Sequence, residues 1–596
     1  MLKKEVAKCK CFVSFVLLFV LVLMPVYSNA YSNQQKIYSL DSDVYEAIAS
    51  LYVLQGLSLP STTAPYSEAE LLMMLDKIHT SELNGATKAT YEYITSQLDV
   101  QPKIQSKGAG FSWNFDTTLE TYTHTDTTNF VGREHWNRGY INQKPLMTVG
   151  LETWPSDSFY GYSEFSVGNT YTLEQGFGTT AFGTNLILVS PAVLTDLDFN
   201  MPYRAFVAMG GDYWSFQIGR DRLNWGAGES GNLMMGDNLK YHNMARLTTF
   251  SEKFKYTFVT SFFPHPTSYI DSDSSHDAVV GDGQEDALSG LTMYMAHRLE
   301  WRMFRDKFNL ALTESIMYQS EENLLDLRIL NPAMIFHDYY IRSNANSLLG
   351  VEFDYTPISG VNFYAQAVVD EFSLPNEPVP SETVENFPIC FGYLAGVKVD
   401  KPIGNLMAHA SLEAAYTDPF LYLRYATKSG VDVTTGADTY GLNYVGVIRE
   451  FTNEVDTRYN AEFIGYTYGG DALVFNLNGG VKQYGKWNVE GNVFYMVHGT
   501  FDKYTAWSNV GGTSSGVDWD ISTPTTSHPT ENYNDDVSDR NSASQTLVVG
   551  FSGSYDLSTS LKLFGQVDYI NCNNYLNRSG QKASDVQLTL GATYHI

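Results

Sequence analysis

The sequence predicts an all-β transmembrane antiparallel barrel preceded by a small α-helical bundle. Three observations support this fold class: most of the chain alternates in hydropathy with a period of two residues, aromatic residues are abundant, and charged residues are scarce. Of the 596 residues, 14% are aromatic and 17% are charged, whereas about 25% charged residues are usual. After residue 30, no stretch approaches the roughly 20 apolar residues of a transmembrane helix, so an embedded chain must close into a barrel.

Residues 1–30 have the organisation of a secretory signal peptide. A basic start, MLKKEVAKCK, precedes the apolar run CFVSFVLLFVLVLM, and the small residues Ser28, Asn29 and Ala30 follow. This arrangement predicts cleavage after Ala30, with a retained membrane anchor as the alternative. Cleavage removes four lysines and one glutamate, a net charge of +3, so the formal charge of −28 falls to −31.

The composition of the mature chain excludes some partners. Lys and Arg form no cluster outside the first ten residues, and phosphate contacts need such clusters, so we expect no nucleic-acid partner. Only Cys390 and Cys572 remain after cleavage. The sequence leaves them either paired or unpaired, and no disulfide framework supports the fold.

Residues 31–105 are predicted to form a periplasmic helical module. A first helix is expected after Asp43, where apolar residues recur at helical spacing until the chain reaches a glycine. A second begins at Ser67 with Glu70 in the capping-box position, and a third covers residues 86–98. Three short helices bury little surface by themselves, so we expect them to dock against the rest of the chain.

Residues 106–596 are predicted to form the barrel. The final strand shows the alternation best, because its apolar and polar residues strictly alternate: Val586, Leu588, Leu590, Ala592, Tyr594 and Ile596 against Asp585, Gln587, Thr589, Gly591, Thr593 and His595. A soluble sandwich or propeller would bury the apolar face, and a membrane barrel would expose it to lipid. Three features favour the barrel. Aromatic residues mark the ends of strands, the sequence ends directly on an alternating strand, and short turns alternate with long polar loops. Its length suggests roughly 16 to 20 strands.

Long polar loops are predicted near residues 171–200, 265–288, 372–386, 427–441 and 499–543. The last of these is the longest, and it is rich in Gly, Ser, Thr, Asn and Asp. Such a composition is typical of a surface loop, here on the outer side of the membrane.

Three sequence patterns resemble catalytic or binding motifs without the required context. Residues 226–231 fit GxGxxG, but they follow an antiparallel strand pattern and not a βαβ unit. Residues 512–516 fit GxSxG inside a low-complexity loop. The acidic segment 271–286 lacks the glycine of an EF-hand, and a solvated loop is the simpler interpretation. We therefore predict no catalytic residue, no cofactor and no metal site.

Residues 217–250 contain the most distinctive cluster of polar and aromatic side chains. Aromatic faces stack on sugar C–H groups, and planar polar groups hydrogen-bond hydroxyls, so this cluster is a candidate polysaccharide-binding surface. The alternative is a lumenal charge ladder or an inward-folded constriction that only stabilises the barrel. The candidate contacts are Trp225 for stacking and Arg220, Arg222 and Asn238 for hydrogen bonds, with Trp507 and Trp519 as further loop candidates.

Several phrases of the sequence resemble the Wzi capsule-assembly family of outer-membrane proteins. They are GRDRLNWGAG (219–228), GNLMMGDN (231–238), HRLEWR (297–302), LRILNPAMIF (327–336) and NSLLGVEFDYTPISGVNFYAQAVVDEF (346–372). The resemblance implies an 18-stranded barrel with a periplasmic helical bundle, acting as a lectin that holds capsular polysaccharide on the cell surface. Ala227 stands where the family pattern leads us to expect proline.

Together these observations predict an outer-membrane protein that binds or organises capsular or surface polysaccharide and is not an enzyme. We expect a monomer that contacts outer-membrane lipid. The alternatives are a porin-like channel for small polar solutes, a surface glycan hydrolase and an adhesin. Measurement of conductance in planar bilayers distinguishes the channel, which gives steady currents, from a plugged lectin barrel. Release of product from purified capsule distinguishes the hydrolase from a protein that only binds polysaccharide.

Overall fold

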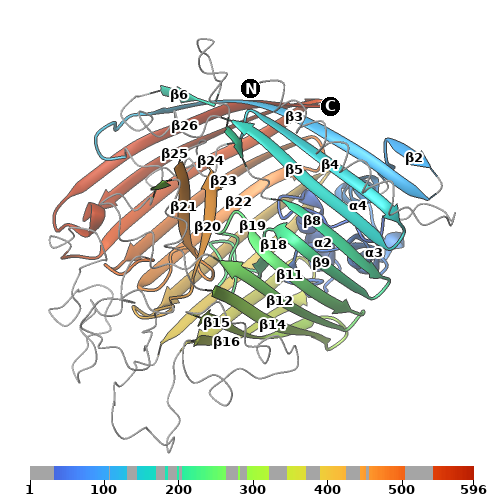
Figure 1. Cartoon of the computed structure of the whole chain (residues 1–596), viewed down its shortest axis with the longest axis horizontal. Coiled ribbons are helices and arrows are strands. Elements are labelled where there is room, and N and C mark those ends of the chain that lie inside the picture. The colour runs from blue at the N-terminus through green and yellow to red at the C-terminus, as the bar shows by residue number, and fades with distance from the viewer. Residues whose placement is uncertain are drawn as a thin grey trace, which may run out of the picture.

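The computed structural model describes residues 33–98, 100–106, 108–130, 144–168, 182–185, 198–200, 204–263, 279–281, 291–320, 345–370, 390–423, 443–451, 456–503 and 541–596. Within these residues, 18 antiparallel strands close into a barrel, and three α-helices lie near the N-terminus (Figure 1). The predicted fold class is confirmed.

The ring follows the order of the chain, and the last strand pairs with the first to close it. The strands are β3 (Ala109–His124), β4 (Met147–Ser156), β5 (Phe159–Gly168), β8 (Ala205–Gly211), β9 (Trp214–Asp221), β11 (His242–Phe250), β12 (Phe254–Phe263), β14 (Leu291–Met303), β15 (Phe308–Ser320), β16 (Ala345–Ile358), β17 (Val361–Val369), β18 (Phe391–Ile403), β19 (Leu406–Thr417), β22 (Ala472–Gln483), β23 (Trp487–His498), β24 (Ser544–Ser558), β25 (Leu561–Asn573) and β26 (Lys582–His595).

Shorter strands add to the ring or lie apart from it. β2 (Ile104–Ser106) and β6 (Phe182–Thr184) pair with β3, and β7 (Asp198–Asn200) pairs with β5. β13 (Val279–Gly281), β21 (Asp456–Phe463) and β20 (Val445–Phe451) form a separate sheet. β1 (Thr63–Ala64) and β10 (Asn224–Trp225) form a two-stranded sheet of their own.

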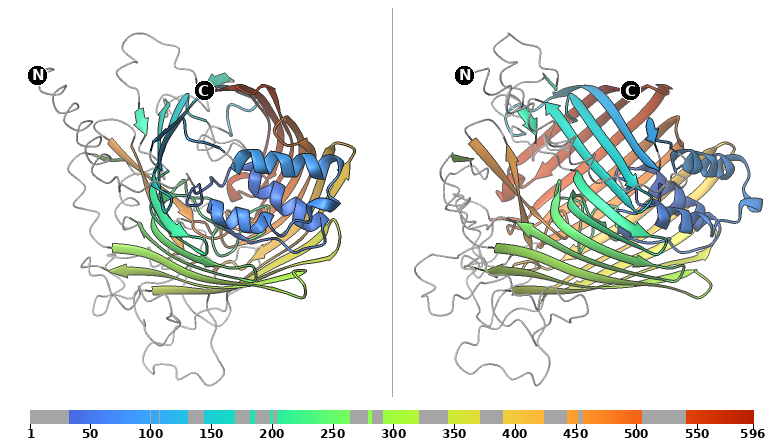
Figure 2. Two further views of the ribbon diagram at one scale, coloured as in Figure 1. Left: turned by 90° about the vertical axis from the view of Figure 1, so that its right-hand side faces the viewer. Right: turned by 45° about the vertical axis from the view of Figure 1, so that its right-hand side comes forward.

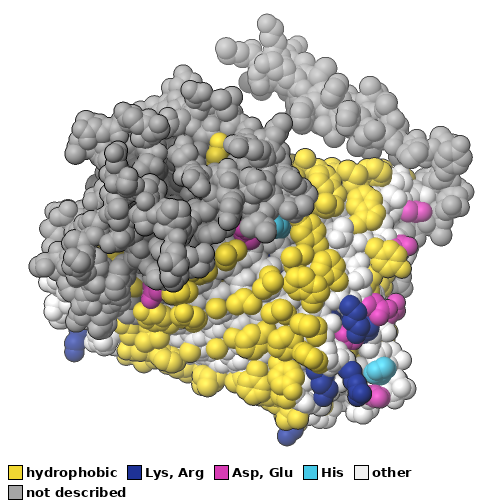
Figure 3. Space-filling view, turned by 90° about the horizontal axis from the view of Figure 1, so that it is seen from below, with side chains coloured by type: hydrophobic (Ala, Val, Ile, Leu, Met, Phe, Trp, Pro, Cys, Tyr) yellow, Lys and Arg dark blue, Asp and Glu magenta, His cyan; other side chains and the backbone are white. Residues whose placement is uncertain are grey.

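The apolar face of the barrel points outward. On β26, the side chains of Val586 and Leu590 are 40% and 51% exposed, whereas Asp585 and Gln587 are 1% and 2% exposed. Figure 3 shows the resulting belt of hydrophobic side chains across neighbouring strands, with charged residues beyond its edge. A closed ring with an apolar outer belt is the architecture of an outer-membrane protein, so the predicted localisation is confirmed. No helix among the described residues is long and apolar enough to cross a membrane.

The two ends of the barrel differ in their connections. Tight turns, such as residues 157–158 and 359–360, join strands at one end, and longer connections join them at the other. Outer-membrane barrels keep their short turns in the periplasm. By this rule, the end with the tight turns, where the helical module lies (Figure 2), is expected to face the periplasm, and we call it the periplasmic end.

The three helices form where the sequence predicts them. α3 (Glu68–Leu75) carries the predicted capping box between Ser67 and Glu70. α4 (Gly85–Leu98) starts one residue before the predicted helix. α2 (Asp43–Leu54) has Ser42 as its N-cap, and not Asp43 as predicted, because the Ser42 hydroxyl accepts the Val44 N–H at 3.4 Å. Short 3₁₀ turns cover Thr80–Glu82 and Tyr575–Asn577.

The helical module has its own core and also docks on the barrel, as expected. Ile48, Leu51 and Leu71 are at most 1% exposed and pack in one apolar cluster. Ion pairs at the periplasmic rim, such as Lys77 to Glu252 at 2.6 Å, attach the module to the barrel turns.

Two further sequence predictions concern the signal peptide and the two cysteines of the mature chain. Residues 1–32 lie outside the described residues, so the signal peptide stays a prediction. Cys390 and Cys572 are both buried and do not form a disulfide.

Candidate functional site

The connection between β9 and β11 folds into the barrel. We call residues 222–241 the inner loop. Its apolar side chains are almost fully buried: Trp225, Leu233 and Met235 are 0% exposed. They belong to a large apolar cluster that also contains inward-facing residues of the wall, including Tyr364 on β17 and Leu394 on β18. The inner loop therefore fills one side of the lumen.

A segment of the helical module reaches the inner loop. Residues 57–66, which we call the N-terminal segment, contribute β1, and Thr63 pairs with Trp225. Next to this pair, the Gly226 N–H donates to the Thr62 carbonyl oxygen at 2.7 Å. The Trp225 N–H donates to the Met235 carbonyl oxygen at 3.0 Å, which folds the inner loop back on itself. Together the two segments form one plug.

Polar side chains of the barrel wall hold the inner loop in place. The Gln366 side chain on β17 donates to the Asn232 side chain at 2.6 Å and accepts the Leu233 N–H at 2.9 Å. The Glu413 carboxylate on β19 accepts the backbone N–H groups of Glu229 and Ser230, each at 2.8 Å. Buried backbone groups of a loop need such partners, and these two residues supply them.

The GxGxxG pattern has a packing role in this structure. Gly226 has a φ of +139°, and a Cβ atom there would lie 2.0 Å from the Asn232 side-chain oxygen. No other residue fits at such a distance. The pattern lies in a lumenal loop between antiparallel strands. It is therefore not part of the βαβ unit that a dinucleotide-binding motif requires, as the sequence predicted.

Buried charges on β14 and β16, next to β17 in the wall, hold the N-terminal segment. Arg298 on β14 is 2% exposed and contacts the carboxylates of Glu300 at 3.3 Å and Glu352 at 3.1 Å. Its guanidinium also donates to the Thr62 hydroxyl at 2.6 Å. The Glu300 carboxylate accepts a hydrogen bond from the Thr63 hydroxyl. One charged cluster thus binds two consecutive residues of the N-terminal segment.

Further wall residues extend this contact along the segment. Lys255 on β12 pairs with Glu70 at 2.7 Å and donates to the Thr63 carbonyl oxygen at 2.9 Å. Asp354 on β16 accepts the Leu59 N–H at 2.7 Å. The plug is therefore held by hydrogen bonds and ion pairs as well as by apolar contacts.

The predicted residues Arg220, Arg222, Trp225 and Asn238 all contact protein groups. Arg220 donates to the Asn243 side chain at 2.7 Å. The Asn238 amide donates to the backbone oxygens of Phe463 and Gly465 at 2.8 and 2.9 Å, which ties the inner loop to the outer connection after β21.

Arg222 joins the inner loop to the helical module. Its guanidinium pairs with Asp41 at 2.9 Å and with Asp237 at 3.0 Å. Burial alone would lower the pKa of Arg222, but the two carboxylates outweigh it and raise the pKa. The charge of Arg222 is therefore retained and neutralised within the protein.

These contacts match the alternative that the sequence left open, an inward-folded constriction that stabilises the barrel. Trp225 is completely buried, so neither face of its ring is available for stacking on a sugar in this conformation. Trp507 and Trp519 lie outside the described residues, as does the acidic segment 271–286 except for residues 279–281, which form β13. In the part of the chain that the structure describes, no group of three His, Cys, Asp or Glu side chains could hold a metal ion.

A second apolar cluster lies on the strands β24 and β25. Val548 on β24 and Ile570 on β25 face inward there and pack with Phe130 and Tyr575 from the outer connections. These side chains are at most 8% exposed. This cluster is separate from the apolar cluster of the plug, although Phe494 packs against both.

Sequence reasoning missed the residues that hold the plug. Glu413, Gln366 and Arg298 stand at polar positions of alternating strands, so the pattern places them in the lumen. It does not show which segment they bind, because their partners lie far away in the sequence.

Comparisons with known proteins address the fold. No family model and no curated protein sequence matches the chain. Among solved structures, the chain is similar to Wzi of Escherichia coli, described as an outer-membrane protein involved in group 1 capsule assembly and a carbohydrate-binding β-barrel. The match has a TM-score of 0.53 and 14% identity, and it covers 94% of this chain and 98% of that one.

Two channel structures match less well. The outer-membrane channel DcaP of Acinetobacter baumannii has a TM-score of 0.34 and 8% identity, covering 83% of this chain and 100% of its own. OccD3 of Pseudomonas aeruginosa has a TM-score of 0.36 and 10% identity, covering 82% and 91%. The similarity to Wzi confirms the fold expected from the sequence resemblance, an 18-stranded barrel with a helical bundle, and at this identity it concerns the fold alone.

Proposed function

We propose that this outer-membrane barrel binds surface or capsular polysaccharide at its outer end and works without catalysis, as a monomer. The observation that carries the proposal is the plug: the inner loop and the N-terminal segment are built into the lumen by buried apolar and charged contacts. A barrel filled in this way suits a rigid platform for outer loops better than an open pore. The description of Wzi as a carbohydrate-binding barrel and the shared sequence phrases add support.

The polysaccharide contacts are proposed to come from the outer connections, with Trp507 and Trp519 as stacking residues. Arg220, Arg222, Trp225 and Asn238 are proposed to support these connections from inside the barrel. Asn238 does so most directly, because it bonds to the connection after β21.

We expect the double variant Trp507→Ala, Trp519→Ala to bind purified capsular polysaccharide of the source strain about tenfold more weakly. Aromatic anchors carry a large share of the binding energy in recognition sites, and about 1.4 kcal/mol corresponds to tenfold in affinity. Binding to immobilised protein and capsule retention on cells would be measured together. Deleting residues 504–540 should weaken binding at least as much.

The matched control is Trp214→Ala, which removes a tryptophan at a periplasmic turn where the side chain is 42% exposed. This variant should bind normally. Unchanged binding by both the double variant and the deletion would disprove the proposed site, and release of shortened glycan from capsule would favour the hydrolase alternative.

The channel alternative makes a different prediction in planar bilayers. We expect the intact protein to give no steady current, because the plug and the second apolar cluster occupy part of the lumen. Replacing residues 223–236 with a short Gly-Ser linker should produce steady currents, and Trp214→Ala should not. Steady cation-selective currents from the intact protein would instead support a porin.

A further inference from the structure

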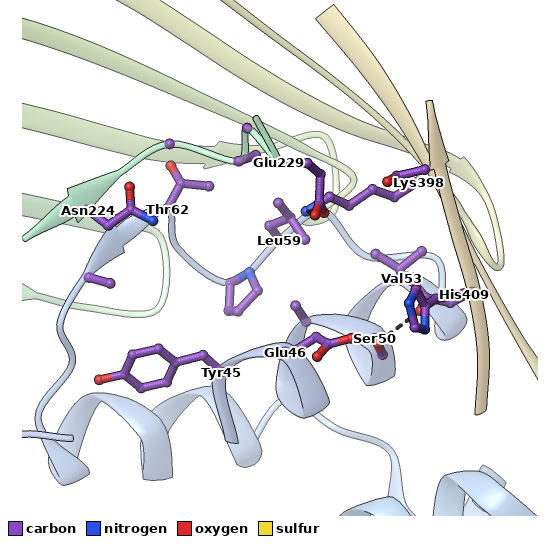
Figure 4. Close-up of a pocket in the computed structure, with 18 of the residues that line it drawn as sticks. Tyr45, Glu46, Ser50, Val53, Leu59, Thr62, Asn224, Glu229, Lys398 and His409 are labelled. Atoms are coloured by element: carbon purple, nitrogen blue, oxygen red, sulfur yellow. Dashed lines mark hydrogen bonds and ion pairs between the residues drawn. The ribbon is translucent and has the colours of Figure 1, made fainter. Parts of the chain in front are cut away.

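A cavity of about 550 Å³ lies between the helical module and the barrel. Its walls come from five parts of the chain: α2, α3, the N-terminal segment, the inner loop, and the strands β18, β19, β22 and β23. Figure 4 shows Glu229 and Lys398 on one side of this cavity and Glu46 and Ser50 of α2 on another. Its volume lies within the roughly 300–1,000 Å³ typical of small-molecule sites.

The charged part of the lining consists of internally paired groups. Lys398 on β18 pairs with Glu229 of the inner loop at 2.5 Å. Lys482 on β22 pairs with Glu46 at 2.6 Å and with Glu490 at 3.2 Å. Both lysines that line the cavity are therefore already engaged by carboxylates.

Carboxylates outnumber ammonium groups in this lining. Two lysines, Lys398 and Lys482, and the imidazole of His409 line the cavity together with five acidic residues, which are Glu46, Glu229, Asp237, Asp400 and Glu490. Of these carboxylates, Asp237 is also paired with Arg222 at 3.0 Å. Burial alone would raise the pKa of Glu229, but Lys398 outweighs it and lowers the pKa, so this carboxylate stays ionised at neutral pH. An anionic ligand would meet more carboxylates than lysines, and both lysines are already paired with carboxylates.

The rest of the lining combines hydrogen-bonding and apolar groups. Side-chain amides come from Asn224, Asn232 and Asn478, and Val53 and Leu59 provide apolar contacts. Tyr45 adds an aromatic ring to the lining, on the opposite side of the view from Val53 (Figure 4). Carboxylates and amides suit the hydroxyl groups of a sugar, and the apolar and aromatic groups suit its C–H faces.

The cavity is accessible from the helical module's side of the barrel. The Glu46 and Glu490 side chains are 45% and 38% exposed, whereas Lys482 between them is 9% exposed. These two carboxylates mark the rim. Since the module lies at the periplasmic end, a ligand would enter from the periplasm.

From this lining and access, we propose that the cavity binds a short saccharide segment that carries no acidic groups. This site is separate from the outer polysaccharide site and does not depend on it. It gives the protein a saccharide contact on each side of the outer membrane.

Three trisaccharides of equal length but different charge test the proposal. They are the trimer of glucosamine, the trimer of N-acetylglucosamine and trigalacturonate, titrated calorimetrically into the full mature protein. The detergent should have no sugar headgroup, since such a headgroup could occupy the site. We expect the first two probes to bind and trigalacturonate to bind at least tenfold more weakly.

A cavity-filling variant locates the site. Ala49→Trp on α2 places an indole among the lining residues and should weaken binding of both probes at least tenfold. The matched control is Ala89→Trp on the exposed face of α4, which should bind like the parent protein. Because Ala49→Trp could disturb docking of the module, Glu490→Gln at the rim provides a second variant. It should reduce the discrimination against trigalacturonate.

The outcomes separate this proposal from the outer site. Three results would each overturn the proposal. The first is that the trimers of glucosamine and N-acetylglucosamine both fail to bind. The second is that trigalacturonate binds as tightly as they do, and the third is that Ala49→Trp binds them like the parent protein. Deletion of residues 504–540 should leave trisaccharide binding intact, even though it should weaken capsular polysaccharide binding at least tenfold.

Discussion

Replacing Trp225 with alanine should lower the free energy of unfolding by about 3–5 kcal/mol, the usual cost of truncating a fully buried large aromatic side chain. Trp225 is 0% exposed and belongs to the apolar cluster that joins the inner loop to the barrel wall. Its neighbours come from several strands and cannot all close onto the void. Urea unfolding in detergent, followed by circular dichroism, would measure the loss.

Trp214→Ala is the matched control for this measurement. Its ring is 42% exposed at a periplasmic turn, so its removal should cost less than about 1 kcal/mol. If Trp225→Ala were no more destabilising than this control, the buried plug would not contribute to the stability of the barrel. Polysaccharide binding by the folded fraction of Trp225→Ala should weaken less than in the Trp507→Ala, Trp519→Ala variant, because the buried Trp225 ring acts only through the outer connections that it supports.

The second large effect is expected for Arg298→Met. Removing this guanidinium leaves the carboxylates of Glu300 and Glu352 buried without their cation, since both lie within 3.3 Å of it. Breaking a buried charge pair from one side costs about 3–5 kcal/mol. The N-terminal segment also loses the hydrogen bond from Arg298 to Thr62, so we expect the helical module to become more sensitive to protease.

A triple variant separates the charge effect from the loss of packing. Arg298→Met combined with Glu300→Gln and Glu352→Gln removes the unpaired charges and should recover a large part of the lost stability. A triple variant as unstable as the single one would show that packing, and not uncompensated charge, dominates. Protease sensitivity of residues 33–66 should follow the same order.

Local features of the sequence were sufficient to predict the elements. The capping box at Ser67 and Glu70 is a signal confined to four residues, and the structure contains it. Alternation on β26 depends only on neighbours along the strand, and the exposed fractions follow it. The shift of the first helix cap from Asp43 to Ser42 reflects a choice between two adjacent capping residues, which a sequence pattern does not resolve.

The position of the inner loop could not be predicted in the same way. Residues 222–241 contain Arg, Trp, Asn and Gly, a composition that suits a sugar-binding loop and a lumenal plug equally well. The decision depends on whether partners such as Glu413 and Gln366 face the same space, and these lie more than 100 residues away in the sequence.

The sequence by itself determined the period of its strands, the caps of its helices and the outward direction of its apolar face, because each depends on residues a few positions apart. Tertiary structure alone decided that Trp225 pairs with Thr63 inside the barrel and that a cavity remains between module and wall. The physical reason is that closing the ring brings distant polar faces together in one lumen. Their buried hydrogen-bonding groups and charges then require partners, which the inner loop and the N-terminal segment supply.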